Sequence, residues 1–95
     1  MQRLSAGVIE LDVQKHTVYA GGEALLLTLK EFELLRILME NAGIVLSRER
    51  LLELVWGYKA DIETRTVDVH VRTLRQKLGR YGDVITTVRG IGYKI

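Results

Sequence analysis

Hydrophobic and polar positions change their spacing along this chain of 95 residues, and the change separates a β-rich first part from a helical second part. Residues 8–13 alternate in their second half, and residues 17–20 are rich in side chains that favour strands. Gly21 and Gly22 form a pair typical of a two-residue hairpin turn, with the returning strand after them. We therefore expect an antiparallel meander over about residues 4–28.

A helix is predicted over about residues 29–41. Thr28 and Glu31 have the spacing of a capping box, in which each side chain accepts a hydrogen bond from the backbone N–H of the other. Asn41 and Gly43 are typical of the end of a helix. One face of this helix carries the apolar side chains Phe32, Leu35, Leu38 and Met39.

Two further helices and a hairpin are predicted after a short strand at residues 44–46. Ser47 can cap a helix over about residues 47–56, and a third helix is expected over about residues 64–78. Residues 84–95 have the pattern of a β-hairpin. The order of sheet, helix, strand, helix, helix and hairpin is that of a winged helix-turn-helix, an α+β fold. The third helix has one apolar stripe, formed by Val67, Val71, Leu74 and Leu78.

The side of the third helix opposite its apolar stripe mixes hydrogen-bond donors, one carboxylate and one aliphatic side chain. This mixture suits the edges of bases in a major groove, where arginine pairs with guanine, glutamine with adenine, and an aliphatic group meets the thymine methyl. An ordinary solvated face explains the helix taken alone equally well. The residues are Arg65, Asp68, Val69, Arg72, Thr73 and Gln76.

The tip of the terminal hairpin carries a second candidate contact. Arg89 precedes Gly90, which permits a positive φ, and an arginine there can enter a narrow minor groove. An exposed turn arginine is the alternative interpretation. Thr87 and Tyr93 flank the tip with hydroxyls that can bond phosphates, although Tyr93 equally fits a half-buried core position with its hydroxyl at the rim.

Two aromatic residues near the helices allow both a structural and a binding interpretation. Trp56, at the end of the second helix, fits the core, and its indole N–H can still donate to a phosphate. His70, on the flank of the third helix, fits a boundary position better than a contact.

Charge is distributed unevenly along the chain. Its formal net charge is +2, with −3 over residues 1–63 and +5 over residues 64–95. A basic third is typical of a protein that binds a polyanion, but charge alone fits a solvated surface better.

The composition argues against several other kinds of protein. With no cysteine and two histidines, the chain has no thiolates for a disulfide or zinc site, and we expect no metal or other cofactor. No catalytic Ser/His/Asp spacing or phosphate loop is present, so we expect no enzyme. No apolar run has the length of a membrane span, and the lack of cysteine fits a reducing cytoplasm.

Four motifs in collinear order resemble the OmpR/PhoB family of response-regulator effector domains, and the resemblance covers about residues 4–95. The motifs are Leu27-Thr28-x-x-Glu31-Phe32-x-Leu34-Leu35, Ser47-Arg48-Glu49-x-Leu51-Leu52-x-x-Val55-Trp56-Gly57, Arg65-Thr66-Val67-Asp68-Val69-His70-Val71-x-x-Leu74-Arg75-x-Lys77-Leu78 and Thr87-Val88-Arg89-Gly90-x-Gly92-Tyr93.

The resemblance implies a four-stranded N-terminal sheet, a three-helix core and a C-terminal hairpin wing. It implies that the third helix reads the major groove and the wing the minor groove of double-stranded DNA, with Arg89 in the minor groove. Bases would be contacted by Asp68, Val69 and Thr73. Phosphates would be contacted by Arg48, Trp56, Arg65, His70, Arg72, Arg75, Thr87 and Tyr93.

The resemblance also implies partners. The loop 57–63 occupies the position through which relatives contact an RNA polymerase subunit, and relatives bind direct repeats as head-to-tail dimers with half-sites about one helical turn apart. Relatives carry a receiver domain that is phosphorylated on an aspartate in a two-component phosphorelay; this chain lacks one. The loop consists of Gly57, Tyr58, Lys59, Ala60, Asp61, Ile62 and Glu63.

One residue departs from the family pattern. Several relatives carry a basic, base-reading residue where this chain has Thr73, which suggests a different half-site.

Two hypotheses from different classes remain at this point. If the chain is part of a sequence-specific transcription regulator, we expect tight, salt-dependent binding to a repeated DNA site. This holds whether the domain is joined to a receiver or to a membrane sensor. A winged-helix module for protein contact predicts an apolar exposed face, and Arg72 and Arg89 argue against it.

Overall fold

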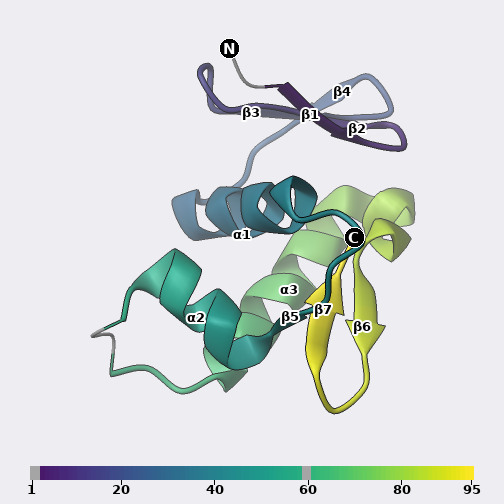
Figure 1. The fold of residues 1–95 in the computed structure, drawn as a ribbon. Helices are drawn as coiled ribbons and strands as arrows, with labels where there is room; N and C mark the ends of the chain where they lie inside the picture. The colour runs from purple at the N-terminus through teal and green to yellow at the C-terminus, as the bar shows by residue number, and fades with distance from the viewer. Residues whose placement is uncertain (1–2, 59–60) are drawn as a thin grey trace.

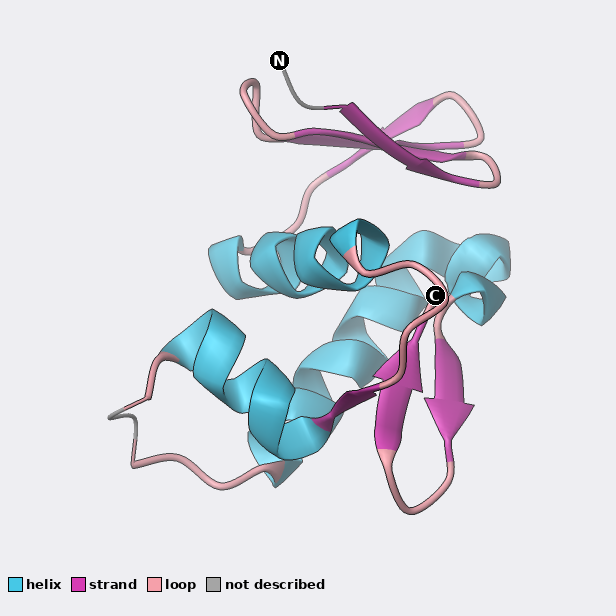
Figure 2. Ribbon diagram, viewed as in Figure 1, coloured by secondary structure: helices cyan, strands magenta, loops and turns pink. Residues whose placement is uncertain are grey.

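The computed structural model describes residues 3–58 and 61–95 and has an α+β architecture (Figures 1 and 2). A four-stranded antiparallel sheet lies over one helix, and two further helices and a three-stranded sheet lie on the other side of that helix. The expected winged-helix fold class is confirmed. The N-terminal sheet has the order β1-β2-β3-β4, with β1 (Arg3–Ala6), β2 (Ile9–Asp12), β3 (Thr17–Ala20) and β4 (Glu23–Leu25).

The N-terminal sheet buries one face and exposes the other. Ile9, Leu11, Val18 and Ala20 are at most 3% exposed and point towards the helices, whereas the residues between them are more exposed. This is the period-two alternation of a sheet with a single packed face. Gly21 has a φ of +58° in the turn that leads into β4.

Helix α1 (Leu29–Glu40) occupies the centre of the molecule, between the N-terminal sheet and helices α2 and α3 (Figure 1). The capping box is confirmed: Glu31 N–H donates to Thr28 Oγ1 at 3.2 Å, and Thr28 N–H donates to Glu31 Oε1 at 2.8 Å. Because α1 is covered on two sides, it also buries Leu34 and Ile37, beyond the single apolar face that periodicity indicates.

The remaining elements form the helix-turn-helix and the wing. Strand β5 pairs with β7, and β7 pairs with β6, so the wing sheet has the order β5-β7-β6. The elements are β5 (Leu46–Ser47), α2 (Arg48–Trp56), α3 (Arg65–Leu78), the 3₁₀ helix η1 (Gly79–Val84), β6 (Thr86–Val88) and β7 (Gly92–Lys94).

Ser47 caps α2 as the sequence predicts, since its Oγ accepts from Arg50 N–H at 3.0 Å, and the helix itself begins at Arg48. Several bounds of the second half differ from the expected ones. The strand before α2 is β5 (Leu46–Ser47) rather than residues 44–46. The sequence predicts no element for residues 79–83 and assigns residue 84 to the wing, whereas the first wing strand begins at Thr86 and residues 79–84 form η1. Gly82 makes this possible, because a Cβ there would lie 2.9 Å from the backbone oxygen of Arg75.

No helix within residues 3–58 and 61–95 combines the length and the apolar character that crossing a membrane requires.

Candidate nucleic-acid interface

Helix α3 presents a narrow exposed arc on the side opposite the core. Its apolar stripe is at most 3% exposed, in agreement with the periodicity. The opposite side is open to solvent, and its one aliphatic side chain, Val69, is 54% exposed. The exposed members of this arc, called the reading arc below, are Arg65, Val69, Arg72 and Gln76.

The wing is hydrogen-bonded along one flank of α3. Arg75 Nη2 donates to the backbone oxygen of Ile85 at 2.6 Å and to Thr87 Oγ1 at 2.8 Å. The hydroxyl of Tyr93 donates to Asp68 Oδ1 at 2.6 Å. These bonds join α3 to the strands on either side of the wing tip, so the helix and the hairpin form one unit.

Asp68 is shared between the wing and helix α2. Its Oδ2 lies 3.3 Å from Nη1 of Arg48, the first residue of α2. Both carboxylate oxygens of Asp68, a residue that the sequence predicts to face bases, therefore have partners within the protein. Tyr93 is 8% exposed, so of the two interpretations the structure favours the core position with the hydroxyl at its rim. Burial, followed by the bond to Asp68, raises the pKa of Tyr93 to about 12.

The other flank of α3 is tied to α1 through Glu31. Thr73 Oγ1 donates to Glu31 Oε2 at 2.7 Å, and Lys77 Nζ donates to Glu31 Oε1 at 2.6 Å. Burial raises the pKa of Glu31, but the bonds from Lys77, Thr28 and Thr73, together with the Lys77 charge, lower it to about 2. The sequence identified Glu31 only as a cap, and its second role depends on residues more than forty positions away.

Trp56 and His70 contact each other between α2 and α3. Their rings meet edge to face, with centroids 4.8 Å apart, and both side chains are half-buried. His70 Nδ1 lies 2.8 Å from the backbone oxygen of Thr66, which calls for a proton on that nitrogen. Lys30 Nζ donates to the backbone oxygen of Val55 at 3.0 Å and fixes the end of α2 against α1.

The wing tip projects three exposed residues into solvent. Arg89 and Ile91 flank Gly90, whose φ is +76°, and Ile91 N–H donates to the backbone oxygen of Val88 at 3.0 Å. Ile91 is 55% exposed, and the sequence analysis did not single it out. Behind the tip, β7 passes close to β5, because Gly92 has no side chain to separate them.

The loop expected to contact polymerase follows α2. Tyr58 is 73% exposed, and its hydroxyl accepts a bond from Arg50 Nη1 at 2.9 Å. Gly57 has a φ of +105°, and residues 61–63 are exposed. Lys59 and Ala60 lie outside the described residues.

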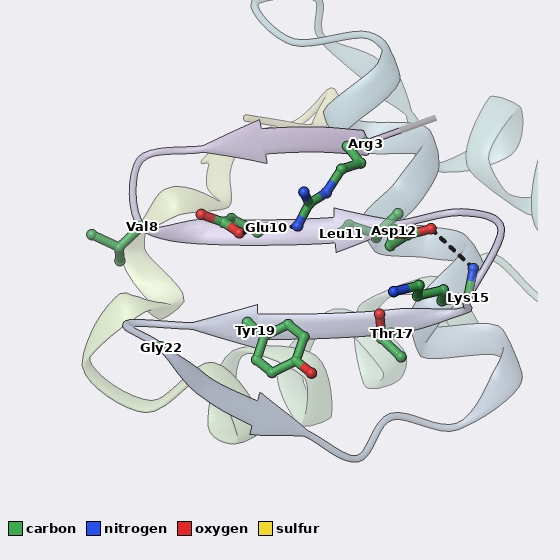
Figure 3. A pocket seen from close by; sticks show the side chains of 9 residues that line it. All are labelled: Arg3, Val8, Glu10, Leu11, Asp12, Lys15, Thr17, Tyr19 and Gly22. Atoms are coloured by element: carbon green, nitrogen blue, oxygen red, sulfur yellow. Dashed lines mark hydrogen bonds and ion pairs between the residues drawn. The ribbon is translucent and has the colours of Figure 1, made fainter. Parts of the chain in front are cut away.

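A shallow depression on the outer face of the N-terminal sheet offers no comparable chemistry (Figure 3). Its charged side chains pair locally: Arg3 lies 3.7 Å from Glu10, and Asp12 accepts from the backbone N–H of Lys15 at 2.9 Å. Across the described part of the chain, no three acidic or histidine side chains gather as a metal site would require. The depression lies on the far side of the sheet from α3 and the wing (Figures 1 and 3).

Comparisons with known proteins agree with this geometry. The family model described as "Transcriptional regulatory protein, C terminal" matches residues 22–95. The sensory transduction protein RegX3 of Mycolicibacterium smegmatis is 46% identical over 97% of this chain, and the response regulator protein PmrA of Pseudomonas aeruginosa is 44% identical over all of it. The chain spans 42% of the length of each of these relatives.

A solved structure extends the agreement to the whole fold. The Klebsiella pneumoniae RstA DNA-binding domain, solved in complex with the RstA box, has a TM-score of 0.85 and 32% identity, covering 100% of this chain and 97% of its own. This chain therefore belongs to the OmpR/PhoB family of C-terminal winged-helix DNA-binding domains of response regulators, a family of transcriptional regulators and not of enzymes.

Proposed function

We propose that this domain binds double-stranded DNA sequence-specifically, with α3 in the major groove and the wing in an adjacent minor groove. The observation that carries the proposal is the reading arc: its two arginines, one glutamine and one valine all face solvent, on a helix whose other side is core. Arg89, exposed at the wing tip, supplies the minor-groove contact. The RstA complex supports the proposal, since a domain of the same fold was solved with its DNA box.

The two DNA contacts are held in a fixed relation by the bonds between α3 and the wing. Arg75 and Tyr93 bond across that junction, so the helix and the wing tip meet the duplex as one rigid surface. Preorganisation of this kind reduces the entropy lost on binding. We assign Arg75 and Tyr93 mainly to positioning the wing against α3, with the exposed edges of their side chains near phosphates.

The rim of the interface would contact phosphates. Arg65 and Arg72 carry exposed guanidinium groups at the edge of the reading arc, and phosphate contacts of this kind fix register without reading sequence. The other side chains that we assign to the rim are Arg48, Trp56, His70 and Thr87.

The role of the whole protein is part of the same proposal. RegX3 and PmrA are more than twice as long as this chain and are named as a sensory transduction protein and a response regulator. We infer that the domain is the output module of such a regulator and works with a phosphorylated receiver domain. It would bind direct repeats as a head-to-tail dimer, and the loop 57–63 would face a polymerase subunit.

Selection of binding sites from random duplex DNA at near-physiological salt tests the proposal. We expect enrichment of a short motif, repeated in the same direction about one helical turn apart. If nothing is enriched, and binding disappears at modest salt, sequence-specific recognition by this chain is ruled out.

Salt dependence then tests the reading arc directly. Arg72→Ala should weaken binding to all sequences and reduce the slope of log affinity against log salt by about one. Arg3→Ala is the matched control, because Arg3 is also an exposed arginine but lies on the N-terminal sheet. Equal slopes for wild type and Arg72→Ala would refute the phosphate contact.

A further inference from the structure

The ring of His70 has one nitrogen that is fixed by the protein and one that is not. His70 lies on the flank of α3 that meets α2, with its ring edge to face against Trp56. Its Nδ1 lies 2.8 Å from the backbone oxygen of Thr66, one turn earlier on the same helix. A carbonyl oxygen can only accept a hydrogen bond, so Nδ1 carries a proton in both charge states of the ring. Gain or loss of the ring charge therefore takes place at Nε2.

The Nε2 atom of His70 is available to a partner outside the protein. Across residues 3–58 and 61–95, no hydrogen bond or ion pair engages this nitrogen, and the protein does not enclose it, so solvent reaches it. In the neutral ring, Nε2 offers a lone pair, which repels a phosphate oxygen. In the charged ring, it carries an N–H that donates to the same oxygen in a charge-assisted hydrogen bond. The phosphate contact that we assign to His70 therefore depends on the charge of its ring.

The groups that face His70 give a charged ring no counter-ion. On α2, its neighbour is the uncharged indole of Trp56. On α1, Lys30 Nζ lies 6.0 Å from the centre of the Trp56 ring and 3.5 Å from Glu33 Oε1, so its charge is paired. No carboxylate in the described part of the chain forms an ion pair with the imidazole. The side chains one turn away on α3 are the uncharged Thr66, Val67, Thr73 and Leu74.

We propose that His70 binds a DNA phosphate only as the imidazolium, so that each domain takes up one proton when it binds DNA. This inference rests on the proposed DNA binding and adds the charge state of one contact. Protonation and binding are then linked in both directions: DNA favours the charged ring, and a lower pH favours the complex. Histidine is the side chain whose charge ordinarily changes between about pH 5 and pH 8, so the effect is expected in that range.

Other titratable groups near the helices keep their charge across this range. The pKa of Tyr93 is raised to about 12 by burial and by its bond to Asp68. The pKa of Glu31 is about 2, because burial, which raises it, is outweighed by the bonds that the carboxylate accepts. The second histidine of the chain, His16, lies in the turn between β2 and β3, with its ring stacked on Phe32. That turn belongs to the N-terminal sheet, which α1 separates from α3 (Figure 1).

The affinity of the wild type at two pH values tests the inference. The probe is the duplex enriched from random DNA, and fluorescence anisotropy is measured at constant ionic strength at about pH 5.5 and about pH 8. We expect roughly tenfold tighter binding at the lower pH, which is the gain of one charge-assisted hydrogen bond. Titration calorimetry in buffers of different ionisation enthalpy counts the proton directly, and we expect an uptake of up to one proton per bound domain.

Three variants assign the proton to a residue. His70→Asn keeps a donor for the Thr66 oxygen and removes Nε2, so it should bind weakly at both pH values without proton uptake. His70→Gln places an amide N–H near the position of Nε2, and it should bind more tightly than His70→Asn and equally at both pH values. His16→Asn is the matched control, because asparagine tolerates the φ of +58° at that position, and it should keep the full response to pH. Circular dichroism at both pH values verifies that each variant is folded.

The outcomes separate the charge state of His70 from DNA binding itself. If the wild type binds the selected duplex tightly and equally at both pH values, without proton uptake, the inference fails and the proposed function stands. If His70→Asn keeps the response to pH, another group takes up the proton and the inference is wrong. If no duplex is enriched, both fail.

Discussion

Glu31 allows a quantitative test of how strongly the bonds between α1 and α3 stabilise the fold. Its side chain is 4% exposed and accepts bonds from the Thr28 backbone, Thr73 and Lys77. The pKa of Glu31 falls from its ordinary value of 4.5 to about 2, because burial, which raises it, is outweighed by these bonds and by the Lys77 charge. At about 1.4 kcal/mol per pH unit, this difference corresponds to about 3 kcal/mol of folding free energy.

The direction in which stability changes with pH follows from proton binding. The folded chain holds the Glu31 proton more weakly than the unfolded chain does, so the stabilisation is complete above pH 4.5 and is lost as the pH falls towards 2. Glu31→Gln should therefore lower the free energy of unfolding at pH 7 by about 2–3 kcal/mol. The gap between wild type and variant should close between about pH 5 and pH 2.

Urea denaturation, followed by circular dichroism at a series of pH values, measures this gap. Glu33→Gln is the matched control on the same helix: Glu33 lies 3.5 Å from Lys30 in a partly exposed ion pair, worth at most about 0.5 kcal/mol. A loss in Glu31→Gln that does not change with pH would refute the electrostatic reasoning. Equal losses in the two variants would refute the special role of Glu31.

Three further predictions concern the wing. Arg89→Ala should weaken binding to sites with A·T-rich flanks more than to sites with G·C-rich flanks, measured by anisotropy; a uniform loss would contradict insertion into a narrow minor groove. Tyr93→Phe removes the hydroxyl that bonds α3 and should cost about 1–2 kcal/mol in urea denaturation; unchanged stability would show that the bond contributes nothing. Gly92→Ala would bring a Cβ against the backbone oxygen of Leu46 and should lower the free energy of unfolding by about 3 kcal/mol or more. Gly90→Asn, where the added side chain meets open space, should lower it by under about 1 kcal/mol, and equal effects of the two variants would contradict the close approach of β7 to β5.

Local sequence features were sufficient to predict most of the fold. Thr28 and Glu31 are three residues apart, and the hydrogen bond between them sets the start of α1. Gly21 lies in the expected turn with a positive φ. The 3₁₀ helix η1 was not predictable from local sequence, because it depends on the close approach of Gly82 to the backbone of Arg75, a contact between separate elements.

The candidate site was predictable only in part, for the same reason. Helical periodicity correctly separates the buried stripe of α3 from its exposed side. Periodicity gives no information about which polar side chains already have partners, however. Asp68 bonds to a residue 25 positions away, and Thr73 to one 42 positions away, so only the tertiary structure reveals that both are occupied.

The pairing of β7 with β5 also has a consequence for the order of folding. Strands of the N-terminal sheet pair with their neighbours in sequence, and such local contacts form quickly. The central strand of the wing sheet, in contrast, must bring Tyr93 to Leu46 across α2, α3, η1 and β6, and forming so non-local a pairing is slow. A partly folded chain should therefore possess the meander and α1 before it possesses a wing. The wing, to which we assign the proposed minor-groove contact, would then be complete only when this long-range pairing has formed.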